Sequence, residues 1–159
     1  EEILRYIVGP WYKCNMTDVM AAIGLAQLDR YQGMLEKRRH MVARMNEAFK
    51  GLDVSVLDHC GDDHCSSHHL YIIRLLGKSR EQVNDVITKM AERGIACNVH
   101  YKPLPMMTAY KALGFDIKNF PNAYKMFENT MSLPLNTRLT EEDLDYVIEN
   151  FLEIVKGLP

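Results

Sequence analysis

One stretch near the start of the chain constrains its fold more than any other. Residues 19–28 are apolar almost all round a helical axis, and Thr17 and Asp18 supply the hydroxyl and the acid favoured at a helix N-terminus. A helix that is apolar on every side is stable in water only when it is buried or paired. The sequence therefore predicts a helix that packs against a large apolar surface of its own chain or of another.

The rest of the chain alternates one-sided helices with short strands. Ser79 and Gln82 form a capping box for one helix, and Gly94 can end it. Such a pattern predicts an α/β sandwich of two layers. The expected helices cover residues 34–51, 79–94, 106–113, 122–129 and 140–155, and the expected extended segments cover residues 54–56, 70–76, 95–101 and 131–135.

Composition narrows the class of protein. The 159 residues carry a formal net charge of −2, which offers no basic field for nucleic acid or an anionic membrane. No apolar run reaches the ~20 residues of a membrane span. The four cysteines are too few and too irregularly spaced for a disulfide framework, so we expect reduced thiols and a cytoplasmic location. The first residue is Glu1, which suggests a chain that begins inside a longer protein.

The predicted strand at residues 95–101 carries a candidate binding site. Alternation places Asn98 and His100 on one face and Tyr101 on the other, unless the strand twists or ends there. Pro103 stops the strand, and side chains at such an end can project into a cleft and bind a sugar or its phosphates. We assign His100 and Tyr101 as candidate substrate-binding residues; the alternative is a structural histidine.

The loop at residues 59–69 contains two cysteines and four histidines. Thiolates and imidazoles at these separations could hold zinc, but their spacing matches no closed two-pair zinc pattern. Histidine-rich tracts are only compositional hints of metal binding. No metal site is therefore predicted from this loop.

A resemblance to a known protein family indicates a function for this chain. Residues 12–28, which read YKCNMTDVMAAIGLAQL, resemble a segment of the DegT/DnrJ/EryC1/StrS family of aminotransferases. The resemblance continues in the right order through residues 68–75, 94–104 and 132–135, and so covers almost the whole chain. It implies the C-terminal part of a fold-type-I enzyme: a remnant of the large domain at 1–16, buried connecting and dimerisation helices at 17–50, and a small α/β domain at 51–159.

The resemblance also implies an activity. Members of this family use pyridoxal phosphate to transfer an amino group, usually from glutamate, to a nucleotide-linked keto sugar in polysaccharide or deoxyaminosugar biosynthesis. The lysine that forms the imine with the cofactor lies upstream of the Tyr12 motif in the family, so we assign no catalytic residue here. The chain alone is expected to be inactive. The alternative hypothesis is a non-catalytic α/β binding or regulatory module related to these enzymes.

The loop before the apolar helix reaches a neighbouring subunit's active site in the family. This implies a homodimer and gives Lys13 and Asn15 a role at the cofactor phosphate or the substrate. The alternative is an exposed lysine and a turn asparagine. Two departures from many relatives, Trp11 in place of glycine and Pro105 in place of histidine, leave the sugar undefined.

Overall fold

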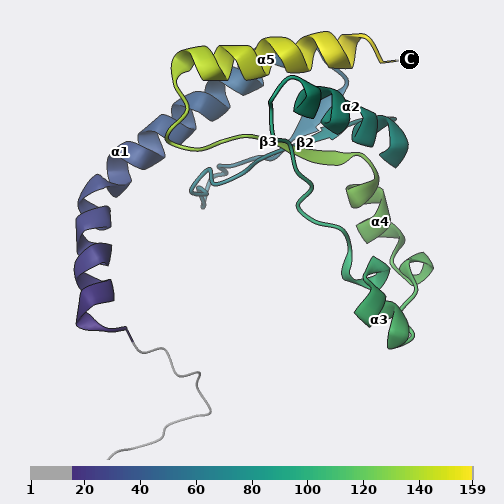
Figure 1. Cartoon of the computed structure of the whole chain (residues 1–159), viewed down its shortest axis with the longest axis horizontal. Helices are drawn as coiled ribbons and strands as arrows, with labels where there is room; N and C mark the ends of the chain where they lie inside the picture. The colour runs from purple at the N-terminus through teal and green to yellow at the C-terminus, as the bar shows by residue number, and fades with distance from the viewer. Residues whose placement is uncertain (1–15, 159) are drawn as a thin grey trace, which may run out of the picture. The chain divides into compact units, whose positions relative to one another are not determined.

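The computed structural model describes residues 16–158 of the chain. They divide into two compact units, the first described over residues 16–33 and the second over residues 34–158. A single helix, α1 (Asp18–Ala48), makes up most of the first unit and continues into the second. Figure 1 labels the α-helices and the strands β2 and β3.

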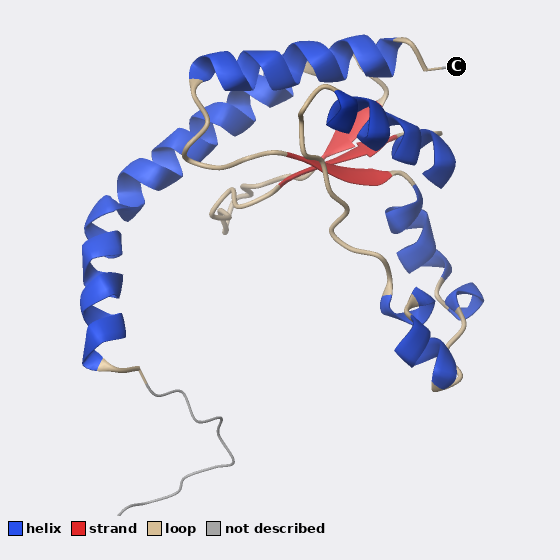
Figure 2. Cartoon of the chain, viewed as in Figure 1, coloured by secondary structure: helices blue, strands red, loops and turns tan. Residues whose placement is uncertain are grey.

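A three-stranded antiparallel sheet is the framework of the second unit. Its strands are β1 (Val54–Val56), β2 (Tyr71–Leu75) and β3 (Thr130–Leu133), in the order β1-β2-β3 (Figure 2). All three lie where the apolar pattern predicts extended segments, so these predictions are confirmed.

Alternation along β2 gives the sheet two different faces. Tyr71, Ile73 and Leu75 are buried, whereas Ile72 and Arg74 point to the opposite face and are half-buried. The first face packs against helices, and the second lines the hollow described below.

The helices α2 (Arg80–Glu92) and α5 (Glu141–Lys156) pack on the apolar face together with the end of α1. Capping boxes start both, with Ser79 paired to Gln82 and Thr140 to Asp143. The two-layer α/β prediction is confirmed. Phe49, in the turn after α1, also joins the core. The helical core residues are Met41, Val42, Met45, Val83, Val86, Met90, Leu144, Val147, Ile148, Phe151 and Ile154.

Between α2 and β3 the chain forms short helices: α3 (Thr108–Ala112), α4 (Pro121–Glu128) and two 3-10 turns, Leu104–Met106 and Ile117–Asn119. None of them contributes a fully buried residue, and α4 leads directly into β3. This segment therefore forms one wall of the sheet's second face rather than part of the core.

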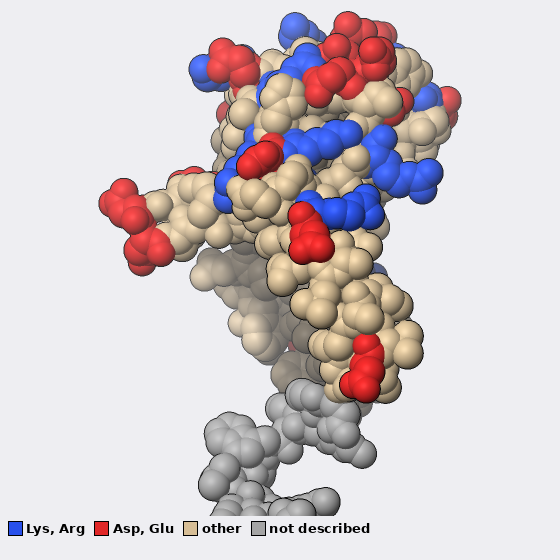
Figure 3. Space-filling model, turned by 90° about the vertical axis from the view of Figure 1, so that its left-hand side faces the viewer, with Lys and Arg blue, Asp and Glu red and all other residues tan. Residues whose placement is uncertain are grey.

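The helices predicted at residues 17–28 and 34–51 are one continuous helix, because no proline separates them and a lone Gly33 costs only about 1 kcal/mol relative to alanine. The apolar side chains of its first part are exposed: Val19 is 71% exposed and Leu28 is 64% exposed. Figure 3 shows few charged side chains on this stretch, next to the grey segment. That this stretch is buried against its own chain or paired with another surface stays a prediction.

The predicted strand at residues 95–101 is wrong. It is reduced to one isolated bridge, in which Asn98 and Ser132 exchange backbone hydrogen bonds of 3.1 and 2.8 Å. The Asn98 side chain accepts a hydrogen bond from the N–H of Val99 at 2.7 Å, a local bond that competes with a strand ladder. Among the described residues, no helix is long and apolar enough to span a membrane.

Candidate functional site

A hollow of about 410 Å³ lies on the sheet face that points away from the helical core. The strand register explains its polar floor: Ser55 pairs with Arg74, Arg74 pairs with Thr130, and Ile72 pairs with Ser132, so these side chains share one face. The wall comes from the segment after α2 and from α4. The residues lining the hollow are Ser55, Val56, Leu57, Ile72, Arg74, His100, Tyr101, Pro103, Ala123, Met126 and Thr130.

Both predicted substrate-binding residues line this hollow. The His100 Nδ1 atom lies 2.8 Å from the hydroxyl oxygen of Ser132, which is buried in β3, so the ring is held by the sheet and Nε2 is left for a ligand. Tyr101 is 76% exposed, and its ring meets that of His100 edge-on at 4.7 Å. Alternation predicted opposite directions for the two side chains; they line one hollow because the chain is not a strand here.

Arg74 provides the positive charge of the hollow. Its Nε donates to the side-chain oxygen of Asn129 at 2.9 Å, and a terminal nitrogen donates to the Lys125 carbonyl at 3.4 Å. These bonds hold the guanidinium beside α4, where it can pair with a phosphate or carboxylate. Arg74 was not among the predicted site residues, although its position between two core residues of a strand is a usable signal.

A second arginine supports the wall from within the protein. Arg80, which is buried at the start of α2, donates to the carbonyls of Phe127 and Thr130 at 3.0 and 2.8 Å and lies 5.1 Å from the centre of the Phe127 ring. Burial lowers the pKa of this guanidinium. Arg80 thus joins α2 to the junction of α4 and β3, and it fixes the wall next to Thr130.

The hollow is suited to binding rather than to covalent chemistry. It offers a cation, an imidazole, a phenol and hydroxyls, which are groups that hydrogen-bond sugar hydroxyls and phosphates. Among the described residues that line it, none is a lysine or a cysteine, so it does not itself provide the amine that would anchor pyridoxal phosphate. Lys13 and Asn15, the predicted cofactor-binding residues, lie outside the described residues.

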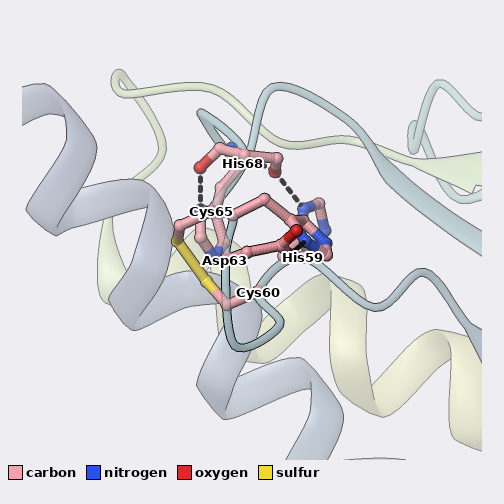
Figure 4. Close-up of a disulfide and its surroundings, with 7 residues drawn as sticks. His59, Cys60, Asp63, Cys65 and His68 are labelled. Atoms are coloured by element: carbon pink, nitrogen blue, oxygen red, sulfur yellow. Dashed lines mark hydrogen bonds and ion pairs between the residues drawn. A yellow bond between two sulfur atoms is a disulfide. The ribbon is translucent and has the colours of Figure 1, made fainter.

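The loop before β2 corrects the prediction of four reduced cysteines. Cys60 and Cys65 form a disulfide, because a tight hairpin places their Cα atoms 4.1 Å apart (Figure 4). The two cysteines are five positions apart in the sequence, and this spacing alone does not reveal the hairpin. Cys97 is free, and burial raises the pKa of its thiol to about 11. His68 lies beside the disulfide, and its ring stacks on that of His59 at 4.4 Å.

Known proteins match most of this chain. The spore coat polysaccharide biosynthesis protein SpsC of Bacillus subtilis is 34% identical over 154 residues, which are 95% of this chain and 40% of SpsC. Solved structures of Spr1654 from Streptococcus pneumoniae, assigned as a sugar aminotransferase, are 51% identical with a TM-score of 0.86 over 95% of this chain and 38% of theirs. The aminotransferase TlmJ of Streptoalloteichus hindustanus is 25% identical with a TM-score of 0.79, over 89% of this chain and 37% of that one.

The chain thus spans about 40% of the length of these relatives. Spr1654 has been solved without cofactor and in its pyridoxal phosphate and pyridoxamine phosphate forms. The DegT/DnrJ/EryC1/StrS aminotransferase family matches residues 4–152, and its sugar aminotransferases share this fold. The resemblance of the four sequence motifs is confirmed: this chain belongs to the DegT/DnrJ/EryC1/StrS aminotransferase family.

Proposed function

We propose that the full-length protein containing this chain transfers an amino group from glutamate to a nucleotide-linked keto sugar, with pyridoxal phosphate as cofactor, in polysaccharide or deoxyaminosugar biosynthesis. The family match over residues 4–152 carries this proposal. The pyridoxal phosphate and pyridoxamine phosphate forms of the 51% identical Spr1654 support the choice of cofactor. We place the enzyme in the cytoplasm, where nucleotide-linked sugars are made.

The hollow on the sheet is proposed as part of the sugar-nucleotide site. Arg74 supplies the charge for a phosphate, the Nε2 atom of His100 hydrogen-bonds a sugar hydroxyl, and the exposed ring of Tyr101 offers a stacking surface. Pyridoxal phosphate supplies the electron sink for amino transfer when it is bound. Because none of the described residues that line the hollow is a lysine, the cofactor is expected to be anchored by other parts of the protein.

The site is proposed to be completed by a second subunit. Lys13 and Asn15 reach the partner's cofactor phosphate or substrate in this proposal, and the exposed apolar part of α1 forms the subunit contact. The 159-residue chain by itself is therefore expected to be inactive.

The proposed reaction is tested by incubating the full-length protein with pyridoxal phosphate, nitrogen-15 glutamate and a panel of nucleotide-linked keto sugars. Mass spectrometry should find the heavy nitrogen in one amino sugar and 2-oxoglutarate in equal amount. Label that stays in glutamate with every sugar tested, in a protein that binds the cofactor, contradicts the proposed acceptor.

We predict that His100→Ala impairs the sugar-nucleotide half-reaction far more than the glutamate half-reaction. A lost hydrogen bond to a neutral sugar hydroxyl costs about 0.5–1.5 kcal/mol, which corresponds to a roughly twofold to tenfold slower step. Single-turnover absorbance measurements on the two half-reactions provide the comparison. Ser132→Ala, which releases Nδ1 of the His100 ring, should give a smaller loss in the same half-reaction. Equal losses in both half-reactions identify His100 as a structural residue.

We also predict that the isolated 159-residue chain does not retain pyridoxal phosphate. The imine-forming lysine of the family lies upstream of the Tyr12 motif, and no lysine lines the hollow among the residues the structure describes. Borohydride reduction followed by mass spectrometry should detect no stoichiometric adduct. The full-length protein is the positive control, and one adduct per isolated chain refutes the prediction.

A further inference from the structure

The loop that holds the disulfide is an ordered hairpin. Its Cys60 and Cys65 form an isolated antiparallel bridge, the N–H of Gly61 donates to the His64 carbonyl at 2.9 Å, and the N–H of Ser66 donates to the His59 carbonyl at 2.7 Å. The backbone hydrogen bonds therefore keep the two cysteines next to each other in a tight turn, whether their sulfur atoms form a disulfide or two thiols.

His68 lies close to the two sulfur atoms, and one of its ring nitrogens already has a hydrogen-bond partner. Its Nδ1 lies 2.9 Å from the Ser66 carbonyl, which can only accept, so Nδ1 carries a proton and donates it. Nε2 is then the atom with the free lone pair. Metal-binding histidines in proteins are commonly oriented by this kind of bond from their second nitrogen to a backbone carbonyl.

The ligand atoms are close enough to share one ion. One ligand atom from each of Cys60, Cys65 and His68 lies within 4.8 Å of the other two (Figure 4). Ligand atoms on one tetrahedral zinc ion, with bonds of about 2.3 Å to sulfur and about 2.0 Å to nitrogen, lie roughly 3.5 Å apart. Small movements of the two exposed cysteine side chains are enough to reach that geometry, whereas His68 is 6% exposed and stays fixed.

The loop that carries the cluster is acidic, while Arg39 of α1 and Asp58 both line the hollow beside it. Residues 58–69 contain three aspartates and no lysine or arginine. The ring of His59 stacks on that of His68 at 4.4 Å and helps to fix its orientation. A second hollow of about 350 Å³, lined by His59, Cys60 and His68, borders the cluster and leaves room for a further ligand.

We propose that Cys60, Cys65 and His68 form a zinc site that thiol–disulfide exchange controls. A dithiol reductant supplies two electrons and two protons; its sulfur atoms join in a disulfide, the Cys60–Cys65 bond breaks, and two thiols form. Zn²⁺ then displaces the two thiol protons and binds both thiolates and Nε2 of His68, with water or a polar ligand in the fourth position. The disulfide form lacks thiolates and binds no zinc.

The test uses the full-length protein, fully reduced by a phosphine or fully oxidised, with Zn²⁺ alone as ligand. Competition with a chromophoric chelator should show about one tightly bound ion per chain in the reduced protein and none in the oxidised protein. Co²⁺ in place of Zn²⁺ should give the sulfur-to-cobalt charge-transfer absorption of thiolate coordination. Reduced protein that binds no zinc, or cobalt binding without that absorption, overturns the proposal.

Matched variants locate the site. Cys60→Ser and Cys65→Ser should each abolish stoichiometric binding, and His68→Asn should weaken it; asparagine suits this position because His68 has a φ of +52°, in the left-handed region. Cys97→Ser removes a thiol outside the loop and should bind zinc like the wild type. Cys60→Ser or Cys65→Ser variants that bind zinc as tightly as the wild type overturn the proposal. Zinc binding is measured without amino transfer, so the result tests the zinc site separately from the proposed reaction.

Discussion

Replacement of Ala22 by glutamate is expected to convert the proposed full-length dimer to monomer or aggregate and to abolish the proposed amino transfer. Ala22 lies in the exposed apolar part of α1, among side chains such as Val19 and Ile23. Burying a few hundred Å² of such surface contributes several kcal/mol at about 25 cal/mol per Å². An unpaired carboxylate inside that contact costs several kcal/mol and removes most of the gain.

Sedimentation velocity and the steady-state transfer rate measure the two effects together. Gln27→Glu is the matched control, because it adds the same charge to the same helix at a position that is already polar and exposed; it should remain dimeric and active. A monomeric Ala22→Glu enzyme with full activity shows that the site is built from one chain, and the cross-subunit role of Lys13 and Asn15 is then wrong. A variant that stays dimeric shows that the subunit contact lies elsewhere.

The second large effect is expected in the core of the small domain. Phe151 of α5 is fully buried, and its ring lies 4.8 Å from that of Phe49, the first residue after α1. Phe151→Ala removes a ring from the layer between α5 and the sheet, and such substitutions destabilise proteins by about 3–5 kcal/mol. This is a large fraction of the stability of a domain of this size.

Urea unfolding of the 159-residue chain, followed by circular dichroism, should show a lower midpoint for Phe151→Ala than for the wild type with a similar slope. Glu149→Ala, two residues earlier on the exposed side of the same helix, should change the free energy of unfolding by no more than about 0.5 kcal/mol. Equal midpoints for the wild type and Phe151→Ala mean that α5 does not pack as described.

Local signals predict the elements of this fold well. The capping boxes at Ser79 and Thr140 lie at the helix starts, and the apolar runs at residues 70–76 and 131–135 predict β2 and β3. These features depend on residues only a few positions apart. The strand predicted at 95–101 fails because Asn98 bonds its own backbone neighbour and the segment meets β3 at a single bridge, which alternation cannot indicate.

The site was only partly predictable, because its parts are brought together by pairing between distant segments. His100 was found from its place at the end of an apolar run, but its partner Ser132 is 32 residues away in sequence. Arg74 joins the same hollow through the register of β2 with β1 and β3. The Cys60–Cys65 pair depends on a hairpin whose bonds involve the backbone and leave no mark in the residue pattern.

The central claim is that this chain is part of a pyridoxal-phosphate-dependent sugar aminotransferase. The most direct measurement is the visible absorption spectrum of the full-length protein, recorded after gel filtration with pyridoxal phosphate and then during stepwise addition of glutamate. We predict absorption from stoichiometric bound cofactor, its loss with release of one 2-oxoglutarate per site, and its return when the correct nucleotide-linked keto sugar is added. A folded, dimeric protein that retains no cofactor and shows no response to glutamate contradicts the claim.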